Sequence, residues 1–577
     1  MFRLLFEIFA TLKKSSRDNF IIVSISQFFL LLFELLFLAV IVPTLSILLS
    51  DDSQVVASFM KYLPEKFSEF NSANFASIFL ISLVILKFLY SSFQTYYQNL
   101  FLTNITAELS NKLYSKYLNS SYSFHIKNDS SKLYEKVFIE TGQFRDFTSA
   151  ILSITSEILF LSSILVILIY FNPLVTIFSA VFLSLILGFF YLLTRGKSYK
   201  WGKERLNIDG KLTKDIIESY NSIKEIIVYN KSAYFIELIK NQNEGKSKLS
   251  AKQLTIVQFP KYCLELAMIL GVFLLIYLFR RFEYNDSQIF NIIGFLVVCL
   301  FKILPSFNKI ILSFNIIKFN QSSLSIVAQE LKTTENDISP KTDASLIFSN
   351  SIELKNVSFS FNKENKILEN FNFKIKKGQK ICIIGDSGSG KSTLINLLLG
   401  LFDTTEGSIL SDGKRIHSYN QSWFDIIGYV PQDVLVNNDT ILNNITFNDE
   451  IKDEEKILKI LRQVGLEKFL KNKYYSNINI GQNGRNISGG QRQRIGIARS
   501  LYRDKEILVF DEATSSLDAS TEQNIFDSIV KIKNLTLIFT THNKDLIKYA
   551  DKVLNLNELN QKSKSIKLNY YERNRFQ

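Results

Sequence analysis

The sequence has only three cysteines in 577 residues. Cys263 and Cys299 lie in apolar runs, and Cys382 lies in a short apolar segment before a glycine-rich loop. This spacing offers neither a disulfide framework nor a set of metal ligands, so we expect all three to be inert, small hydrophobic residues. We also expect no cleavable signal peptide, because the first apolar run is too long and lacks a small-residue cleavage site.

Positive charge is in excess, with 67 Lys and Arg residues against 54 Asp and Glu residues and a net charge of +13. Such an excess can indicate a nucleic-acid-binding protein, but its distribution argues against that class. Basic residues gather near the N-terminus and in the segments 99–148 and 195–259, between long apolar runs. This pattern is typical of the cytoplasmic segments of a membrane protein, so we expect no nucleic-acid partner.

Six apolar stretches are long enough to cross a lipid bilayer. They lie near residues 20–49, 75–98, 149–171, 174–194, 260–280 and 287–313. The basic segments between them predict a multi-pass membrane protein with both termini in the cytoplasm. We therefore expect a transmembrane domain over 1–328, a linker over 329–350 and a soluble nucleotide-binding domain over 351–577.

A phosphate-binding P-loop is predicted by the segment Gly385-Asp386-Ser387-Gly388-Ser389-Gly390-Lys391-Ser392, followed by Thr393. Apolar residues on both sides predict the strand and the helix that such a loop joins. Backbone N–H groups of the loop and the N-terminus of the helix surround the phosphate oxygens. We expect Lys391 to contact the β- and γ-phosphates and Ser392 to bind Mg²⁺. The predicted cofactors are ATP and Mg²⁺.

Two adjacent carboxylates, Asp511 and Glu512, end a later apolar strand. The first is placed to hold Mg²⁺, and the second is placed to orient water for attack on the γ-phosphate. Gln432, after Pro431, and His542, after a further apolar run, complete the expected catalytic set. Gln432 is also a candidate Mg²⁺ ligand.

Further motifs of this region are an aromatic residue, Phe361, upstream of the P-loop, and the segment Ile487-Ser488-Gly489-Gly490-Gln491, followed by Ser516-Leu517-Asp518. Taken in order, the motifs resemble those of ABC ATPases over residues 350–557. The resemblance implies that Phe361 stacks on adenine and that Ser488, Gly489, Gly490 and Gln491 form the signature that contacts ATP. In that family the P-loop of one copy meets the signature of another, so a homodimer is implied.

The whole chain resembles ABC exporters, which implies a six-helix transmembrane domain of the exporter type followed by an α/β P-loop ABC ATPase domain. In such proteins the spanning helices continue into the cytosol and are joined by short transverse helices. Candidates for these are residues 121–132 and 219–224.

The membrane half resembles bacterial lipid-linked oligosaccharide flippases of the PglK type. The resemblance is carried by Glu34, Ser156-Glu157-Ile158, Pro260 to Glu265 and Leu304 to Lys309, with Ile384 to Leu394 and Asn443 to Phe447 in the soluble half. It implies ATP-driven movement of an anionic, polyprenyl-pyrophosphate-linked oligosaccharide across the bacterial inner membrane. Lysine stands at three positions where that family tends to carry arginine, namely Lys87, Lys261 and Lys302.

Two readings of the charged residues in the spans remain open. Charge inside a bilayer is costly, so such residues face a cavity or one another. The lysines form a basic lining for an anionic substrate, or they pair with carboxylates that fasten the bundle. The lysines are Lys87, Lys261, Lys302 and Lys309, and the carboxylates are Glu34, Glu157 and Glu265.

Two other functions are alternatives to a flippase. The first is an exporter of peptides or hydrophobic drugs, but we expect no peptidase domain before residue 20, and His125 has no neighbouring catalytic cysteine. The second is an ATP-gated channel or sensor. That class often loses the catalytic glutamate, whereas this chain keeps Glu512 and His542.

Overall fold

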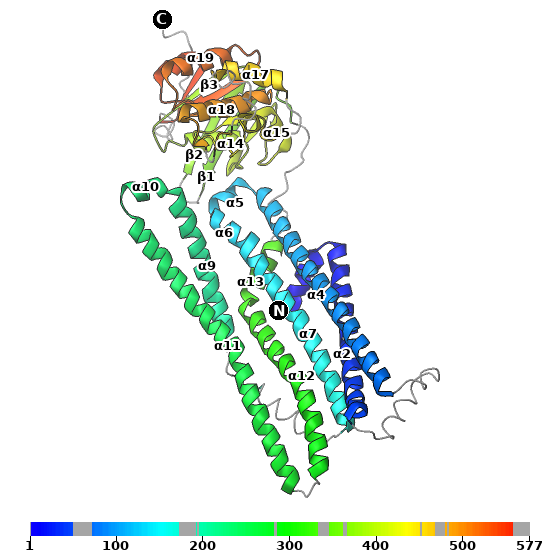
Figure 1. Ribbon diagram of the computed structural model, residues 1–577. Helices are drawn as coiled ribbons and strands as arrows, with labels where there is room; N and C mark the ends of the chain where they lie inside the picture. Colours follow the sequence, from blue (N-terminus) through cyan, green and yellow to red (C-terminus); the bar gives the residue numbers. More distant parts are fainter. Residues whose placement is uncertain are drawn as a thin grey trace. The chain divides into compact units, whose positions relative to one another are not determined.

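The computed structural model describes residues 2–49, 72–171, 188, 192, 196–281, 286–332, 346–361, 366–449, 453–467, 479–481 and 484–557. These residues divide into two compact units. The first consists of Met1–Leu118 and Asn128–Glu335, and the second of Asn119–Lys127 and Asn336–Gln577. Helices make up the first unit, and the second is an α/β unit (Figure 1).

The long helices of the first unit are α2 (Lys14–Leu49), α4 (Ser72–Leu118), α7 (Thr141–Phe171), α9 (Lys197–Asn221), α11 (Ser232–Arg281) and α12 (Asp286–Phe319). Shorter segments are α1 (Phe2–Thr11), α6 (Ser130–Tyr134), the π-helix η2 (Glu135–Glu140), α10 (Ile223–Val228) and α13 (Gln321–Lys332). At 1.5 Å per residue, the 50 residues of α11 extend about 75 Å. That length exceeds the roughly 30 Å of a bilayer core more than twofold, so a large part of α11 lies outside a membrane.

Five of the six predicted spans fall within helices α2, α4, α7, α11 and α12. The span near 174–194 lies outside the described residues except for Gly188 and Leu192. By length and composition, three helical stretches of the described chain can cross a membrane, namely Lys14–Phe37, Ser77–Leu118 and Ser130–Val166. A bent pair, Ile303–Phe319 with Gln321–Lys332, is a fourth if it counts as one span. The six-span topology stays a prediction.

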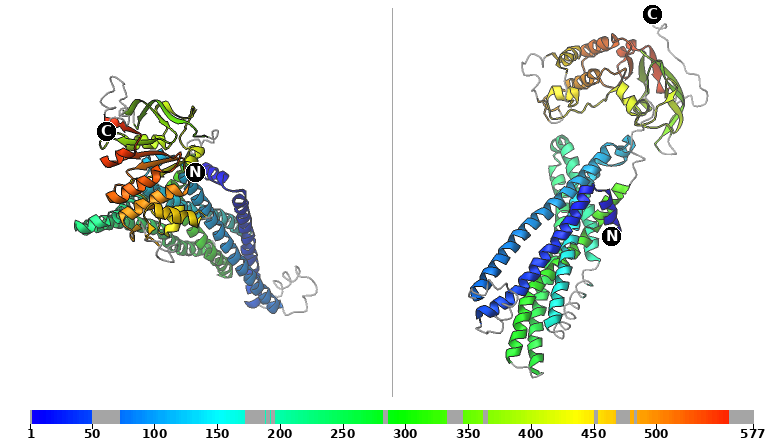
Figure 2. Two further views of the ribbon diagram at one scale, coloured as in Figure 1. Left: turned by 90° about the horizontal axis from the view of Figure 1, so that it is seen from above. Right: turned by 90° about the vertical axis from the view of Figure 1, so that its right-hand side faces the viewer.

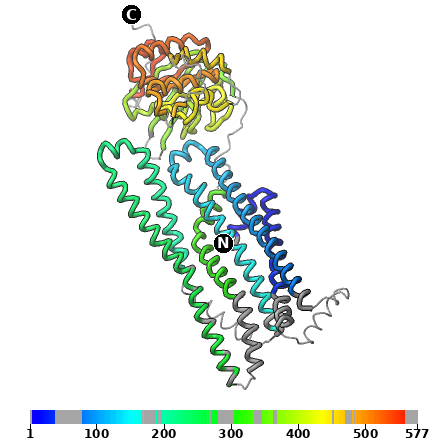
Figure 3. Tube along the Cα trace, viewed as in Figure 1, coloured from blue at the N-terminus to red at the C-terminus, as the bar shows by residue number. Residues whose placement is uncertain are grey.

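The C-terminal part of α4 has an amphipathic pattern. Leu102, Ile105, Leu109 and Leu113 recur at three- and four-residue spacing, and all four are buried. Leu102, Ile105 and Leu109 belong to a core that residues of α1, α2, α7, α12 and α13 complete, whereas apolar residues earlier on α4, such as Ile81 and Phe88, are exposed. Helix α2 packs on α4 and α7 packs on α12, and α9 runs beside α11 with α10 at their shared end (Figures 1, 2 and 3).

The second unit contains two sheets. An antiparallel sheet has the order β2-β1-β4-β5, formed by Lys366–Lys376, Ser351–Ser360, Glu406–Ser411 and Lys414–Arg415. A parallel sheet has the order β6-β7-β8-β3-β9, formed by Ile427–Val430, Ile507–Asp511, Thr536–Thr540, Lys380–Ile384 and Lys552–Asn555. Strands of the parallel sheet are almost continuously apolar because helices cover both faces.

The helices of this unit are α14 (Lys391–Leu398), α15 (Gln421–Ile426), α16 (Ile441–Thr446), α17 (Glu454–Gln463), α18 (Gly489–Tyr502), α19 (Ala519–Val530) and the 3-10 helix η7 (Lys544–Tyr549). The carboxyl ends of parallel strands meet at one edge of a sheet, where ligands of α/β proteins bind. Strands β3, β7 and β8 end at this edge with the P-loop, the paired carboxylates and the segment before His542. The predicted order of a helical domain followed by an α/β domain is confirmed.

Two short helices lie where transverse helices were predicted, with different bounds. Helix α5 (Tyr122–Lys127) ends before Asp129, which has an extended backbone and begins α6, so the predicted helix 121–132 is two helices. Helix α9 continues to Asn221, and α10 starts only after Ser222 leaves the helical region of the backbone. Residues 219–221 therefore extend α9, and the short helix that follows ends later than residue 224.

The predicted linker over 329–350 overlaps the end of α13 at its start and meets β1 at its end. Helix α13 continues through Lys332 and β1 begins at Ser351, while residues 333–345 lie outside the described residues. Cys382 is buried on β3 and Cys263 is half-buried on α11, and both are free thiols. The side chain of Cys299 is not among those described.

Candidate functional site

The P-loop lies between β3 and α14, as its sequence predicts. Gly388 and Gly390 have φ angles of 82° and 98°, a backbone region that glycine enters without steric cost. The side chain of Lys391 is 8% exposed, and its Nζ donates hydrogen bonds to the carbonyl oxygens of Gly385 at 2.6 Å and Asp386 at 3.1 Å. The ammonium group is thus enclosed by the loop that is to hold the phosphates.

The three residues predicted to be catalytic lie together, since Gln432 and His542 both contact the carboxylate of Glu512. Glu512 directly follows β7, its Oε2 accepts a hydrogen bond from Nε2 of Gln432 at 2.9 Å, and its Oε1 lies 2.9 Å from Nε2 of His542. Gln432 and His542 are 80 and 30 residues away in the sequence. The arrangement holds both oxygens of Glu512 in place, which suits a residue that orients water.

Asp511 is a partly buried carboxylate close to the ammonium group of Lys391. Burial raises its pKa, the charge of Glu512 raises it further, and a hydrogen bond from Thr540 and the charge of Lys391 oppose this rise. A divalent cation bound here would likewise favour the ionised carboxylate.

The predicted Mg²⁺ ligands are of the chemical type that this ion binds. A carboxylate from Asp511, a hydroxyl from Ser392 and an amide oxygen from Gln432 are the oxygen donors that Mg²⁺ prefers. Among the described residues, no group of three or more His, Cys, Asp and Glu side chains can hold a metal ion. Mg²⁺ commonly uses one or two carboxylates together with phosphate oxygens, so one aspartate beside the P-loop is sufficient.

Phe361 directly follows β1 and is 54% exposed. The rings of Phe359 and Phe402 contact it in edge-on geometry, at centroid distances of 5.1 Å and 5.5 Å. These contacts fix the ring and leave much of it exposed, as stacking on an adenine base requires.

Helix α5 clusters with the second unit. The backbone N–H of Tyr122 donates a hydrogen bond to the hydroxyl of Tyr419, and the ring of Tyr122 lies 5.7 Å from that of Phe402. Because Phe402 also supports Phe361, α5 contacts the aromatic group that carries the expected adenine platform.

The signature residues open helix α18. Ser488 caps it, since its Oγ accepts a hydrogen bond from the backbone N–H of Gln491 at 3.2 Å, and Oε1 of Gln491 accepts one from the N–H of Ser488 at 2.9 Å. This capping box engages the side chain of Gln491, which was predicted to contact nucleotide. At Gly490 a Cβ atom would stand 2.9 Å from the carbonyl oxygen of Ser516, so glycine permits a close approach of the two segments.

Two residues that the sequence did not identify hold these motifs together. Gln493 is 4% exposed, and it donates to the hydroxyl of Ser515 at 3.0 Å while its Oε1 accepts from the N–H of Ser516 at 2.9 Å. Asn557 accepts a hydrogen bond from the P-loop N–H of Asp386 at 2.9 Å. Gln493 lies two residues after the signature and Asn557 lies outside any recognised motif, and the sequence assigned a role to neither.

Two lysines of the predicted spans pair with carboxylates on neighbouring helices. Nζ of Lys87 on α4 lies 2.7 Å from Oε1 of Glu34 on α2. Nζ of Lys309 on α12 lies 2.8 Å from Oε1 of Glu157 on α7. Each pair joins two helices that pack on each other. This arrangement matches the interpretation in which the lysines pair with carboxylates that fasten the bundle.

Lys261 is exposed, and its Nζ lies 3.9 Å from Oε1 of Glu265, one turn further along α11. The side chain of Lys302 lies outside the described residues. Each described lysine of the four thus has a carboxylate partner within 4 Å.

Comparison with known sequences gives two family matches. The family described as the ABC transporter transmembrane region matches residues 19–304, and the family described as ABC transporter matches residues 368–515. The first covers the long helices, and the second covers the P-loop, the signature and the paired carboxylates.

Relatives with different printed roles are similar to this chain. An export ATP-binding/permease protein of Rickettsia bellii is 30% identical over 83% of this chain and 84% of its own length. An ATP-dependent lipid A-core flippase of Saccharophagus degradans is 26% identical over 83% and 82%. The lactococcin-G-processing and transport protein LagD of Lactococcus lactis is 28% identical over 63% of this chain, which spans about half, 52%, of that protein.

A solved structure shares the fold. A bacterial Atm1-family ABC exporter with ATP bound superposes with a TM-score of 0.74 over 91% of this chain and 93% of its own, at 20% identity. The two family matches, the full-length relatives and the solved structure all indicate the same order of a transmembrane region followed by an ATPase. This chain is therefore a member of the ABC transporter family, an exporter with a transmembrane domain followed by an ABC ATPase domain.

Proposed function

We propose that two copies of this chain form an ATP-driven flippase for an anionic lipid of the bacterial inner membrane, with a polyprenyl-pyrophosphate-linked oligosaccharide as its substrate. The observation that supports this proposal best is the charge within the apolar helices. The pairs Lys87–Glu34 and Lys309–Glu157 place ammonium groups where an uncompensated charge is costly. A lysine whose partner is a carboxylate can exchange it for a pyrophosphate, which offers more than one negative charge.

The proposed chemistry uses the residues that converge beside the P-loop. Lys391 binds the β- and γ-phosphates, and Asp511, Ser392 and Gln432 would hold Mg²⁺, which would neutralise charge on the phosphates. Glu512 takes a proton from the attacking water, while Gln432 and His542 keep its carboxylate oriented.

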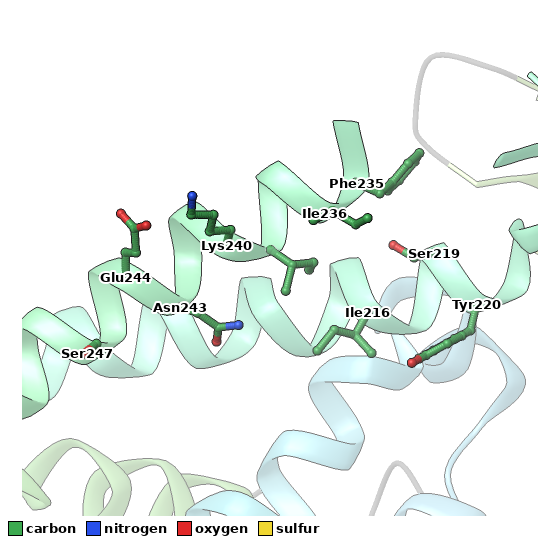
Figure 4. Close-up of a pocket in the computed structure, with 10 residues that line it drawn as sticks. Ile216, Ser219, Tyr220, Phe235, Ile236, Lys240, Asn243, Glu244 and Ser247 are labelled. Carbon is green, nitrogen blue, oxygen red and sulfur yellow. The ribbon is translucent and has the colours of Figure 1, made fainter. Parts of the chain in front are cut away.

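In this proposal two copies pack together, so that the signature of each copy completes the ATP site of the other. Helices α9 and α11 leave a cavity of about 730 Å³ between them. Apolar side chains such as Ile216, Tyr220, Phe235 and Ile236 line it together with polar ones such as Lys240 and Glu244 (Figure 4). Tyr220 and Ile236 are largely exposed. Exposed apolar faces of this kind mark protein or membrane contacts, and they support packing of the helix pair against a second copy.

The ATPase rate of the protein in lipid nanodiscs tests the substrate. We compare a polyprenyl-pyrophosphate oligosaccharide, its dephosphorylated polyprenol, an anionic phospholipid and an apolar peptide as additives. The proposal expects stimulation by the pyrophosphate lipid and none by the polyprenol, which lacks both the pyrophosphate and the oligosaccharide joined through it. Stimulation by the peptide alone would favour a peptide exporter, and an unchanged rate with all four would favour a gate or sensor.

Neutralising Lys87 should separate its two roles. Lys87→Gln removes the ion pair with Glu34 at 2.7 Å, which destabilises the helix bundle whether or not Lys87 binds substrate. The double variant Lys87→Gln/Glu34→Gln removes the pair without leaving a charge behind. We expect it to fold with a wild-type melting temperature and basal ATPase rate, yet to lose at least about tenfold in flipping, as a lost charged hydrogen bond implies.

A matched control is Lys214→Gln/Glu218→Gln, which removes an exposed pair on α9 outside the predicted spans. Its flipping rate should equal that of the wild type. If the double variant at Lys87 and Glu34 flips lipid as fast as the wild type, the pair is only a fastener and the anionic-headgroup role of Lys87 is wrong.

A further inference from the structure

We propose that Thr540 is a positioning residue for ATP hydrolysis, whose hydroxyl fixes both carboxylate residues at the end of β7. Thr540 is the last residue of β8 and lies opposite Asp511 in the parallel register of the two strands. Its side chain is 3% exposed. Its Oγ1 accepts a hydrogen bond from the backbone N–H of Glu512 at 2.8 Å and lies 3.1 Å from Oδ1 of Asp511.

The backbone of Glu512 needs such a partner. Its φ is 48°, in the left-handed region that residues other than glycine seldom occupy. A conformation of this kind persists only where surrounding groups hold it. The hydrogen bond from the N–H of Glu512 to Thr540 supplies that restraint at the point where the chain leaves β7 and turns its carboxylate toward Gln432 and His542.

The single proton of the Thr540 hydroxyl has two possible acceptors. Oδ1 of Asp511 lies at 3.1 Å, and the carbonyl oxygen of Phe510 lies at 3.4 Å. The shorter contact is to a carboxylate, and hydrogen bonds to ionised acceptors are the stronger kind. The buried hydroxyl of Thr540 therefore accepts a hydrogen bond from Glu512, which is to orient water, and donates one to Asp511, which is to bind Mg²⁺.

The alternative is that Thr540 is an ordinary buried polar group. Strand β8 offers a control for it, because the residues between its two terminal threonines are apolar and Thr536 at the other end is also buried. Its hydroxyl accepts a hydrogen bond from the N–H of Gly378 at 2.8 Å. Thr536 thus has the same residue type, strand and burial, but it has no contact with the carboxylates.

The test compares steady-state ATP hydrolysis of Thr540→Val, Thr540→Ser and Thr536→Val. Valine keeps the shape of threonine but cannot accept a hydrogen bond from Glu512. We expect Thr540→Val to lower kcat between about 10- and 100-fold, the cost of a small misplacement of a catalytic group, with KM for ATP changed less than about twofold. Thr540→Ser keeps the hydroxyl and should restore kcat to within about threefold, and Thr536→Val should stay in the same range.

A wild-type kcat for Thr540→Val, or an equal loss for Thr536→Val, would overturn the proposal. If Thr540→Val fails to fold, Thr540→Cys serves instead, since a thiol fits the strand and is a weak acceptor. A further readout is the single-turnover rate in a Glu512→Gln background. If Thr540 acts through Glu512, Thr540→Val should lower this rate by a smaller factor there than it does in the wild type. An equal cost in both backgrounds would contradict a positioning role.

Discussion

Replacing Glu512 by glutamine should leave ATP binding intact and lower the hydrolysis rate by at least about a hundredfold, the usual contribution of a general base. Glutamine keeps the shape of the side chain and can still contact Gln432 and His542, but it cannot take a proton from water. The variant should accumulate as a closed, ATP-bound dimer. The measurements are kcat, the affinity for ATP, and the fraction of dimers trapped in the presence of ATP.

Glu506→Gln is the matched control for this variant. Glu506 directly precedes the same strand β7 and pairs with Lys377 at 2.5 Å, away from the carboxyl end of the strand. We expect it to hydrolyse ATP at nearly the wild-type rate. If Glu512→Gln also keeps nearly wild-type turnover, Glu512 is not the general base.

Mixing two inactive variants should restore ATP hydrolysis. Lys391→Ala disables the P-loop, and Gly489→Asp places a negative charge at the start of α18, where the signature is to face the γ-phosphate of the partner copy. In a heterodimer of the two, one composite site is intact and the other carries both defects. Because random pairing makes half of all dimers heterodimers, we expect about a quarter of the wild-type rate if the sites act independently.

The negative control mixes Lys391→Ala with a chain that carries both substitutions, since no pairing of these chains gives an intact site. Heterodimer formation is checked with two affinity tags. An inactive first mixture in which tagged heterodimers are abundant would mean that the sites are not shared between copies or that one site cannot turn over alone.

The sequence predicted the chemistry of the ATP site better than its supporting contacts. The P-loop, Asp511 and Glu512 are short motifs tied to strand ends, and parallel strands bring such ends to one edge. Gln432 and His542 follow strands of the same sheet, so their convergence on Glu512 follows from the topology. The support from Thr540 depends on the register of β8 against β7, which the sequence of neither strand specifies.

The pairing of the membrane lysines shows a similar limit. Hydropathy and composition identify lysines and glutamates in the spans, but their partners depend on which helices are neighbours. The packing of α2 on α4 sets Lys87 against Glu34, and that of α7 on α12 sets Lys309 against Glu157. Helix ends are also hidden from hydropathy, because polar residues continue α4 and α11 well beyond their apolar stretches.

The central claim is that ATP hydrolysis by this protein moves an anionic lipid across a bilayer. The most direct test reconstitutes the protein in liposomes with a fluorescent polyprenyl-pyrophosphate oligosaccharide and follows headgroup exposure with a membrane-impermeant quencher. We predict headgroup movement that requires ATP and is absent in Glu512→Gln. Full ATP hydrolysis in the same liposomes without any movement of the headgroup between leaflets would contradict the claim.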